Sequence, residues 1–319
     1  MLKRLLMLLV TMVTVSFLAF TAFTVIGGDP ATILLGTQAT PEAVAALREE
    51  LGLNAPFLVQ YWNWLTAFFV GDFGTSYIYN QSVTTLLAGK VGLSLRLCGL
   101  AFVIIVVLAT PVALFSVRYE ERPELRWRLL RGWDVTATQF SMSLPPFFLG
   151  VVITWVFSVV LKWFVVGSLP DIATDPVGHW TYLLFPAITL AVPRIAKTVR
   201  MLRATVVHQM RQDYVRTAIA RGANRSRVLY CHVLKNALAP VVSFLAQTLA
   251  ELVAAAIVVE QVFSLPGLGR MLISSIGNRD YAVVQAIVVM LALWVVAVNG
   301  MADLFNTALD PRLRMGGGK

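Results

Sequence analysis

The sequence predicts an all-α integral membrane protein with six transmembrane helices and an extracytoplasmic segment after the first of them. Of its 319 residues, 58% are hydrophobic and only 13% are charged, whereas soluble domains average about 45–50% apolar and about 25% charged residues. A membrane-spanning helix needs about 20 mainly apolar residues. Six segments meet that requirement, and they cover residues 5–26, 91–117, 135–161, 183–202, 237–259 and 282–305.

The distribution of basic residues predicts the orientation of the chain. Twenty of the 26 Lys and Arg residues fall at the N-terminus, in 118–131, in 194–235 and in the C-terminal tail. With six spans and both termini in the cytoplasm, all four segments lie inside the cell, as the positive-inside rule requires. We therefore attribute the net charge of +9 to membrane topology. Nucleic-acid binding is not indicated, because no basic tract is interleaved with aromatic residues.

Residues 1–90 are predicted to form the first transmembrane helix and the extracytoplasmic segment, and residues 91–319 a five-helix core. Lys3 and Arg4 precede an apolar run of about 22 residues. A signal peptide has an apolar region of only ~7–15 residues. We therefore expect the first span to be retained in the mature protein.

Two short helices are expected in the extracytoplasmic segment. Thr40 is typical of a helix cap, and Gly52 of a helix end, which predicts a helix over 41–51. Pro56 introduces a second helix over 57–69. Its aromatic side chains suit a helix lying at the membrane interface, and they also suit a docking surface for an outside partner. They are Phe57, Tyr61, Trp62, Trp64, Phe68 and Phe69.

Prolines and one carboxylate inside the predicted spans are candidates for lining a polar pathway. Pro145 and Pro146 in the third span, and Pro186 and Pro193 in the fourth, are expected to kink or break their helices. Such breaks survive in a membrane where protein or a watery cavity covers the freed backbone groups, although prolines also serve as packing kinks. Glu251 in the fifth span costs about 2.5–3.5 kcal/mol on insertion. We expect it either to pair with a cation or to line the pathway.

The segment of about 206–236 is the most informative part of the chain, because it is charged and lies between two apolar spans. Asp213 is expected to cap a short helix over 214–221, with Gly222 at the C′ position after it. Asn224 or Ser226 is then expected to cap a second helix that returns to the membrane.

Two short helices joined at a glycine make a stiff bracket, which suits docking of a soluble partner. The alternative is an ordinary cytoplasmic loop, because the positive-inside rule alone would explain the basic charge of this segment. The residues expected to form the docking surface are small, aromatic or charged. They are Asp213, Tyr214, Arg216, Thr217, Ala218, Arg221 and Gly222.

The bracket belongs to a longer pattern. The stretch Asp213-Tyr-Val-Arg-Thr-Ala-Ile-Ala-Arg-Gly222 is followed by His232-Val-Leu-Lys-Asn236-Ala-Leu-Ala-Pro240. Together they resemble the cytoplasmic coupling loop of permease subunits of binding-protein-dependent ABC importers, in the dipeptide, oligopeptide and nickel branch. Further stretches, in order over nearly the whole chain, are similar to landmarks of the same branch. They are 28–31, 51–53, 60–61, 71–74, 260–269 and 309–312.

The resemblance implies an importer-type permease core and a set of partners in a bacterial inner membrane. These are a second, homologous permease subunit forming a heterodimer, two cytosolic ATPases docked on the bracket, and an extracytoplasmic solute-binding protein. The resemblance implies no catalytic, cofactor or metal residue in this chain, since ATP is bound by partner subunits. No Gly-x-x-x-x-Gly-Lys-Ser/Thr phosphate loop is found. The implied cargo is a di- or oligopeptide, with a nickel or other metal chelate as the alternative.

The same resemblance gives a role to the loop that follows the fifth span. Pro266 and Gly267 are expected to turn the chain sharply, so that Val262, Phe263 and Leu265 project outward. They would then form an outer gate or a docking surface for the binding protein. Without the resemblance, a plain turn is the simpler interpretation.

Other classes of protein fit the sequence less well. Arg194, Lys197, Arg200 and Arg203 recur at the spacing of a voltage-sensing helix, and Glu251 is the main candidate to neutralise one of them. However, no Thr-Val-Gly-Tyr-Gly filter supports a cation channel. A secondary transporter would explain the prolines but would have no use for a bracket that docks a motor. An intramembrane enzyme lacks a His-Glu-x-x-His or Gly-x-Ser-x-Gly motif.

Overall fold

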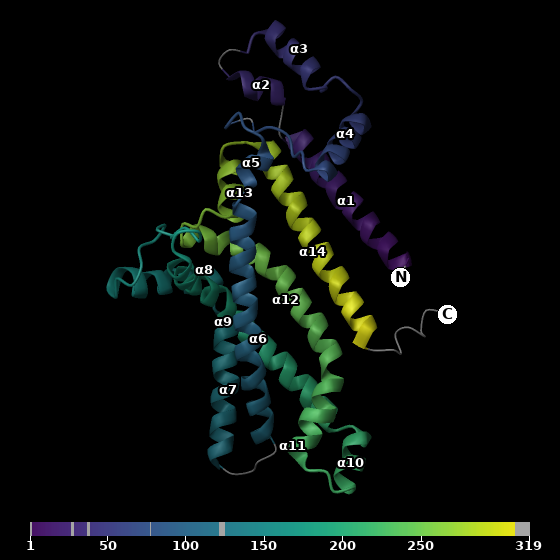
Figure 1. The fold of residues 1–319 in the computed structure, drawn as a ribbon, viewed down its shortest axis with the longest axis vertical. Helices are drawn as coiled ribbons and strands as arrows, with labels where there is room; N and C mark the ends of the chain where they lie inside the picture. The colour runs from purple at the N-terminus through teal and green to yellow at the C-terminus, as the bar shows by residue number, and fades with distance from the viewer. Residues whose placement is uncertain (1, 27–28, 37–38, 77, 121–124, 310–319) are drawn as a thin grey trace. The chain divides into compact units, whose positions relative to one another are not determined.

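The computed structural model describes residues 2–26, 29–36, 39–76, 78–120 and 125–309 (Figure 1). Every regular element within these ranges is a helix, and an isolated bridge pairs Thr75 with Ser82. The predicted all-α class is therefore confirmed for the described residues. The chain divides into two compact units, which are Met1–Ser94 with Pro266–Val296, and Leu95–Leu265 with Ala297–Lys319. The landmark at 309–312 lies almost entirely outside the described residues.

Four helical stretches in the described part of the chain are long and apolar enough to cross a membrane, and a bent helix pair raises the number to five if it counts as one span. The four coincide with the second, fourth, fifth and sixth predicted spans. They lie within α5 and α6 (Val83–Leu87 and Lys90–Glu120), α9 (Pro176–Met210), α12 (Leu234–Val262) and α14 (Tyr281–Leu309). The first predicted span falls on α1 (Leu2–Ile26), whose described apolar part is the shorter stretch Leu9–Val25. The count of six crossings stays a prediction.

The third predicted span is broken into two segments. α7 (Leu125–Ser143) is followed by α8 (Pro146–Ile153) and a π-helical turn, η2 (Thr154–Val160). The chain bends by 94° between them. Pro145 has extended backbone and Pro146 takes the first position of α8, and neither has an N–H to continue the preceding helix. The break predicted from these two prolines is confirmed.

The fourth predicted span, α9, is a single continuous helix. The local break that Pro186 and Pro193 predicted there is absent, and both prolines are buried inside the chain. α9 packs against α12, α7 and α8. Neighbouring helices shield the carbonyl groups that a proline leaves without a donor, which is how membrane helices tolerate this residue.

α8 lies close to its neighbours at Gly150. A Cβ atom added there would lie 3.2 Å from Cγ1 of Val262 and 3.3 Å from Cγ2 of Thr189. These distances are shorter than an ordinary contact between carbon atoms, which is about 3.5–4.0 Å. The absence of a side chain at Gly150 therefore sets how tightly α8 packs against α9 and the end of α12.

We expect Gly150→Leu to destabilise the protein by about 1–3 kcal/mol, the usual cost of forcing extra atoms into a packed site. The measurement is thermal unfolding of the purified subunit in detergent. Gly99→Leu is the matched control, because a Cβ atom at Gly99 of α6 meets nothing within 4 Å. Equal losses in the two variants would contradict this account of Gly150.

The aromatic helix α4 (Phe57–Val70) packs against α1 along one face. Tyr61 is buried between Phe17 and Phe20, with ring centroids 5.1 and 5.5 Å away. Its hydroxyl also shares a hydrogen bond of 2.8 Å with Ser16. Other aromatic residues of α4, such as Trp62, remain exposed. The helix predicted over 57–69 is confirmed, and part of its aromatic content serves packing on α1 rather than the membrane interface or a partner.

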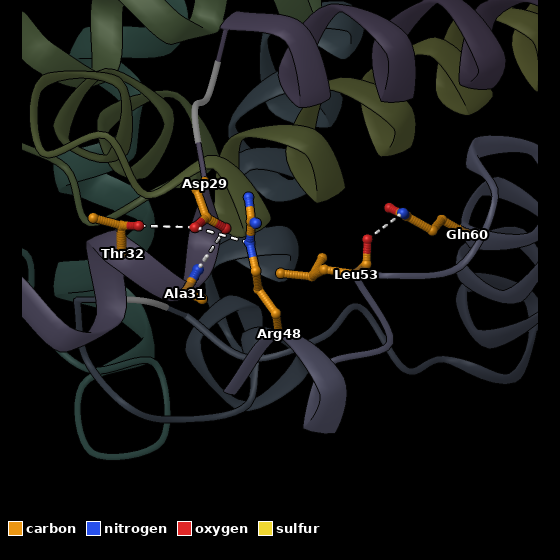
Figure 2. A network of polar contacts seen from close by, with 6 residues as sticks. All are labelled: Asp29, Ala31, Thr32, Arg48, Leu53 and Gln60. Atoms are coloured by element: carbon orange, nitrogen blue, oxygen red, sulfur yellow. Dashed lines mark hydrogen bonds and ion pairs between the residues drawn. The ribbon is translucent and has the colours of Figure 1, made fainter. Parts of the chain in front are cut away.

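Two short helices, α2 (Pro30–Leu35) and α3 (Pro41–Glu50), pack together ahead of α4. Asp29 caps α2, and its carboxylate accepts hydrogen bonds from Thr32 Oγ1 at 2.8 Å and from the Ala31 N–H at 3.3 Å (Figure 2). Arg48 of α3 reaches the same carboxylate, with Nε 3.1 Å from Oδ2. These contacts hold α2 and α3 together.

A side chain of α4 holds the turn between α3 and α4 in place. Gln60 of α4 donates to the carbonyl oxygen of Leu53 at 2.9 Å (Figure 2). It also donates to the carbonyl oxygen of Ala55 at 2.8 Å. The Thr40 hydroxyl caps α3 by accepting from the Ala43 N–H at 3.3 Å, and Gly52 has a φ of +67°. The helix start and helix end predicted at these two positions are confirmed.

The contacts of Asp29 predict a dependence of stability on pH. Burial works to raise the pKa of Asp29, but hydrogen bonds from Thr32, Arg48 and Ala31 outweigh it, so the pKa lies below its ordinary value. The stabilisation is therefore present above the unfolded pKa of about 3.9 and is lost as the pH falls through the lower folded pKa. It is expected to be small, about 1 kcal/mol or less, because Arg48 is 49% exposed.

The corresponding measurement compares wild type with Asp29→Asn by thermal unfolding across pH. We expect the wild type to be the more stable at pH 7 and the difference to disappear as the pH falls through the lowered pKa of Asp29. A difference that is constant over this range would show that the charge of Asp29 is not responsible.

Candidate functional site

The predicted bracket is present as two short helices joined by a tight turn. α10 (Asp213–Ala220) follows α9 after only two residues. α11 (Arg225–Val228) continues directly into a π-helical turn, η3 (Leu229–Val233), and then into α12. α10 and α11 pack against each other at one end of the second unit (Figure 1). The bracket is therefore joined by short connections to α9 and α12, which pack against each other.

The turn between α10 and α11 is a Schellman motif centred on Gly222. The Ala223 N–H donates to the Ala218 carbonyl at 3.1 Å, and the Gly222 N–H donates to the Ile219 carbonyl at 2.9 Å. Gly222 has a φ of +83°, a region that glycine enters without strain. The glycine predicted at the C′ position is confirmed.

Asn224 begins the second helix of the bracket. Its side-chain oxygen accepts a hydrogen bond from the Ser226 N–H at 3.1 Å, and its carbonyl accepts from the Val228 N–H at 3.0 Å. Of the two caps that the sequence allowed, Asn224 and Ser226, the structure selects Asn224.

Asp213 does not cap α10, contrary to prediction. The N-cap is Gln212, which makes no capping hydrogen bond through its side chain, and Asp213 is the first helical residue. The Asp213 carboxylate lies 3.6 Å from a guanidinium nitrogen of Arg216, and both side chains are largely exposed. A carboxylate in the first turn also interacts favourably with the helix dipole. The sequence therefore predicted a helix at this place correctly but put its first residue one position too late.

Apolar side chains fasten the bracket to the ends of the long helices. Val215 of α10 is 1% exposed and lies in a buried cluster formed by four stretches of the second unit. The other members of the cluster are Ala109, Ala113, Leu114, Val117, Val199, Leu202, Val206, Val228, Leu229, Val233, Ala237 and Val241. Because α10 shares this core with α6, α9 and α12, the bracket is a packed part of the helical bundle.

The inner face of α10 includes two residues that were predicted to face a partner. Tyr214 and Ala218 are partly buried and pack against the cluster around Val215, and the Tyr214 hydroxyl donates to Gln209 Oε1 at 3.0 Å. Steps of three and four residues place side chains on the same side of a helix, so Ala218 follows Tyr214 and Val215 to the inside. A docking role for these two partly buried residues stays a prediction.

The exposed face of α10 is mostly polar. Together with the turn that follows α10, it contains five of the predicted docking residues, and Ile219 and Ala220 are exposed beside them. The exposed residues are Asp213, Arg216, Thr217, Ile219, Ala220, Arg221 and Gly222. Ile219 lies three residues after Arg216, and this spacing was the available sign that it shares the outer face.

The loop after α12 is buried, contrary to prediction. Phe263 and Leu265 are fully covered, and Val262 is half-buried. The Phe263 carbonyl accepts a hydrogen bond from the Tyr182 hydroxyl at 3.0 Å, and its ring lies 6.2 Å from that of Phe164 between centroids. These apolar side chains are core residues that pack against α9 and the segment before it, so they do not project outward.

The turn of this loop begins earlier than predicted. It starts at Phe263 and Ser264, where the φ of Ser264 is +51°, and the chain bends again at Gly267, one of the two predicted residues. Gly267 has extended backbone and forms the N-cap of α13 (Leu268–Gly277). A role for these residues in gating or docking stays a prediction.

The candidates for a pathway lining differ in how far they are buried, and their role in a pathway stays a prediction. Pro145 is exposed, Pro146 is half-buried and Pro193 is buried. Glu251 is exposed on α12, and Gln247 donates to its carboxylate at 3.3 Å. Arg194 of α9 is the adjacent cation, because it donates to the Glu251 backbone carbonyl at 3.4 Å. The sequence offered four possible cations for Glu251, and helix packing selects this one.

Comparison with known proteins assigns the chain to a family. Residues 126–315 match the family described as binding-protein-dependent transport system inner membrane component, and residues 1–98 match the N-terminal part of the membrane components of such systems. A probable peptide ABC transporter permease protein of Sinorhizobium fredii is 32% identical over 290 residues, which are 90% of each chain. A putative peptide transport system permease protein of Brucella abortus is 33% identical over 294 residues, 91% of this chain and 90% of the relative.

A third relative is similar over an even larger share of the chain. The glutathione transport system permease protein GsiC of Salmonella typhimurium is 33% identical over 313 residues, which are 98% of both chains. The matches therefore extend from the first helix to the end of α14 and include the bracket. This chain belongs to the family of permease subunits of binding-protein-dependent ABC importers.

Proposed function

We propose that this chain is a permease subunit of an ATP-driven importer that carries di- or oligopeptides into a bacterial cell. The observation that carries the proposal is the construction of α10. Its inner face is fixed in the core through Val215, and its outer face is polar and exposed. A soluble motor that moves a membrane protein needs a docking element of this kind. The names of the relatives, two peptide permeases and a glutathione permease, support a peptide cargo.

The proposed arrangement has six membrane crossings with both termini in the cytoplasm. Residues 1–90 supply the first helix and the extracytoplasmic segment, and residues 91–319 supply a five-helix core. A homologous second permease completes the pathway, two cytosolic ATPases bind ATP and dock on the outer face of α10, and a solute-binding protein delivers the cargo from outside. The basic character of 118–131 and 194–235 supports this orientation.

The mechanism follows from the packing of the bracket. When the ATPases close on ATP, they displace α10. Because Val215 shares one core with residues of α9 and α12, the displacement passes to these helices and not into a flexible loop. The bundle then changes between two packed arrangements, facing opposite sides of the membrane. The chain itself contributes position and rigidity, and hydrolysis takes place in the partner subunits.

The test is reconstitution of the chain with a second permease, ATPases and a solute-binding protein from the same organism. We expect uptake of labelled peptide into proteoliposomes that depends on ATP and on all four kinds of subunit. Uptake by this chain alone would instead indicate a secondary transporter. Uptake of a nickel chelate without uptake of peptides would assign the alternative cargo.

A further inference from the structure

A polar stripe runs along the middle of α12. Ser243, Gln247 and Glu251 recur every four residues, lie within the candidate span Pro240–Val262, and are all exposed on this chain. Residues four apart lie on the same face of a helix. Hydrocarbon does not solvate a carboxamide or a carboxylate, and polar groups at this depth normally face a water-filled cavity or another protein segment. This face of α12 is therefore not directed to lipid.

The two charged groups near the centre of this region are exposed to different extents. Arg194 is 9% exposed and donates to the carbonyl oxygens of Leu190 at 3.1 Å and Glu251 at 3.4 Å. Its Nε has no hydrogen-bond partner among the described residues. The Glu251 carboxylate is exposed and accepts from Gln247 at 3.3 Å. The charge that the stripe presents outward is thus negative, while the positive charge is covered.

The position of Arg194 bears on what Glu251 binds. An isolated carboxylate in a membrane span needs a compensating cation. Arg194 lies next to Glu251, but it donates to the Glu251 backbone carbonyl, while the carboxylate accepts from Gln247. The exposed carboxylate remains available to a mobile cation.

We propose that the Glu251 carboxylate receives the N-terminal ammonium group of a peptide as it moves along this face of α12. Gln247 orients the carboxylate, and Arg194 is a positioning residue that holds the Glu251 turn against α9. This inference rests on the proposed function. Free peptides of every sequence carry an α-amino group with a pKa of about 7.7–8.0, so most of it is protonated at neutral pH. A single carboxylate therefore recognises a feature that is shared by all members of a varied cargo.

The first arm of the test asks whether the stripe faces water. Glu251→Cys is made in a Cys231→Ser background, because Cys231 is exposed and Cys98 is buried, and the assembled complex is treated with a water-soluble thiol reagent. Leu252→Cys is the matched control, because Leu252 follows Glu251 in the chain and is fully buried. We expect the cysteine at position 251 to react and the one at position 252 not to react. No reaction at position 251, with or without ATP, would show that protein covers the stripe and would overturn the proposal.

The second arm asks whether the ammonium group is the ligand. The binding protein is preloaded with trialanine or with N-acetyl-trialanine, and uptake by the complex is measured for wild type, Glu251→Gln and Glu251→Asp. We expect Glu251→Gln to lower uptake of trialanine by roughly three- to tenfold, the scale of losing one partly solvated ion pair. The same variant should leave uptake of the acetylated peptide unchanged, and Glu251→Asp should keep the wild-type preference.

Three results would overturn the proposal. These are equal losses for both peptides in Glu251→Gln, no loss for either peptide, and failure of the Glu251→Gln complex to assemble, which would assign Glu251 to the contact with the second permease. If the wild-type complex imports neither peptide, the proposed function itself fails. That outcome is distinct, because it is seen before any variant is compared.

Discussion

Replacing Gly222 with leucine is expected to lower ATP-dependent uptake at least about tenfold while the subunit still inserts into the membrane. Gly222 has a φ of +83°, and a residue with a Cβ atom pays about 1–2 kcal/mol to adopt left-handed backbone. The leucine side chain meets no atom of this chain within 4 Å of its Cβ. Its bulk would instead project from the exposed turn toward the docked ATPase, so that both strain and steric exclusion act on the coupling contact.

Two further variants separate these causes. Gly222→Ala introduces the backbone strain with little bulk, and Gly222→Asn introduces moderate bulk in a residue that tolerates left-handed backbone. If exclusion of the ATPase dominates, uptake should be lost in the order Leu, Asn, Ala. If strain dominates, Ala should be more harmful than Asn. ATP hydrolysis is measured in parallel, since uncoupling lowers uptake more than hydrolysis. Normal uptake by a well-expressed Gly222→Leu complex would count heavily against α10 as the docking element.

The features that the sequence predicted well depend on residues close together in the chain. Gly222 ends α10 and Asn224 begins α11 because their own backbone and side chains satisfy nearby N–H and carbonyl groups. The caps at Thr40 and the break at Pro145 arise in the same way. Each of these effects acts within one helical turn, so no knowledge of distant neighbours was needed to predict it.

The features that the sequence did not predict depend on contacts between distant segments. Phe263 next to a turn suggested an exposed docking group, but Tyr182 and Phe164 bury it. Pro193 suggested a kinked or broken helix, but α9 is continuous across it, with other helices packed around α9. Among four evenly spaced basic residues, only the crossing of α9 and α12 shows that Arg194 is the neighbour of Glu251. Spacing along the chain identifies such residues as unusual, whereas packing decides what they contact.

Placing a carboxylate at Val215 is expected to release α10 from the bundle. Val215 is 1% exposed and lies among aliphatic side chains from four parts of the second unit. Val215→Asp buries a charge without a partner in an apolar cluster, and such changes cost about 3–5 kcal/mol. α10 can avoid part of this cost by leaving the cluster, because it is short and its outer face is already solvated. We therefore expect local loss of α10 packing before loss of the long helices.

The measurements are hydrogen exchange over 213–222 and ATP-dependent uptake by the assembled complex. For the exchange measurement, Ile219→Asp is the matched control, because it places the same side chain on the same helix at a residue that is 39% exposed. We expect exchange to accelerate in Val215→Asp and to stay at the wild-type rate in Ile219→Asp, and we expect uptake to be lost in Val215→Asp even if the ATPases still hydrolyse ATP. If a rigid bracket transmits the motion of the ATPases, uptake must be lost when α10 leaves the cluster. Full uptake by a complex in which α10 exchanges freely would mean that the motor moves the bundle through another contact.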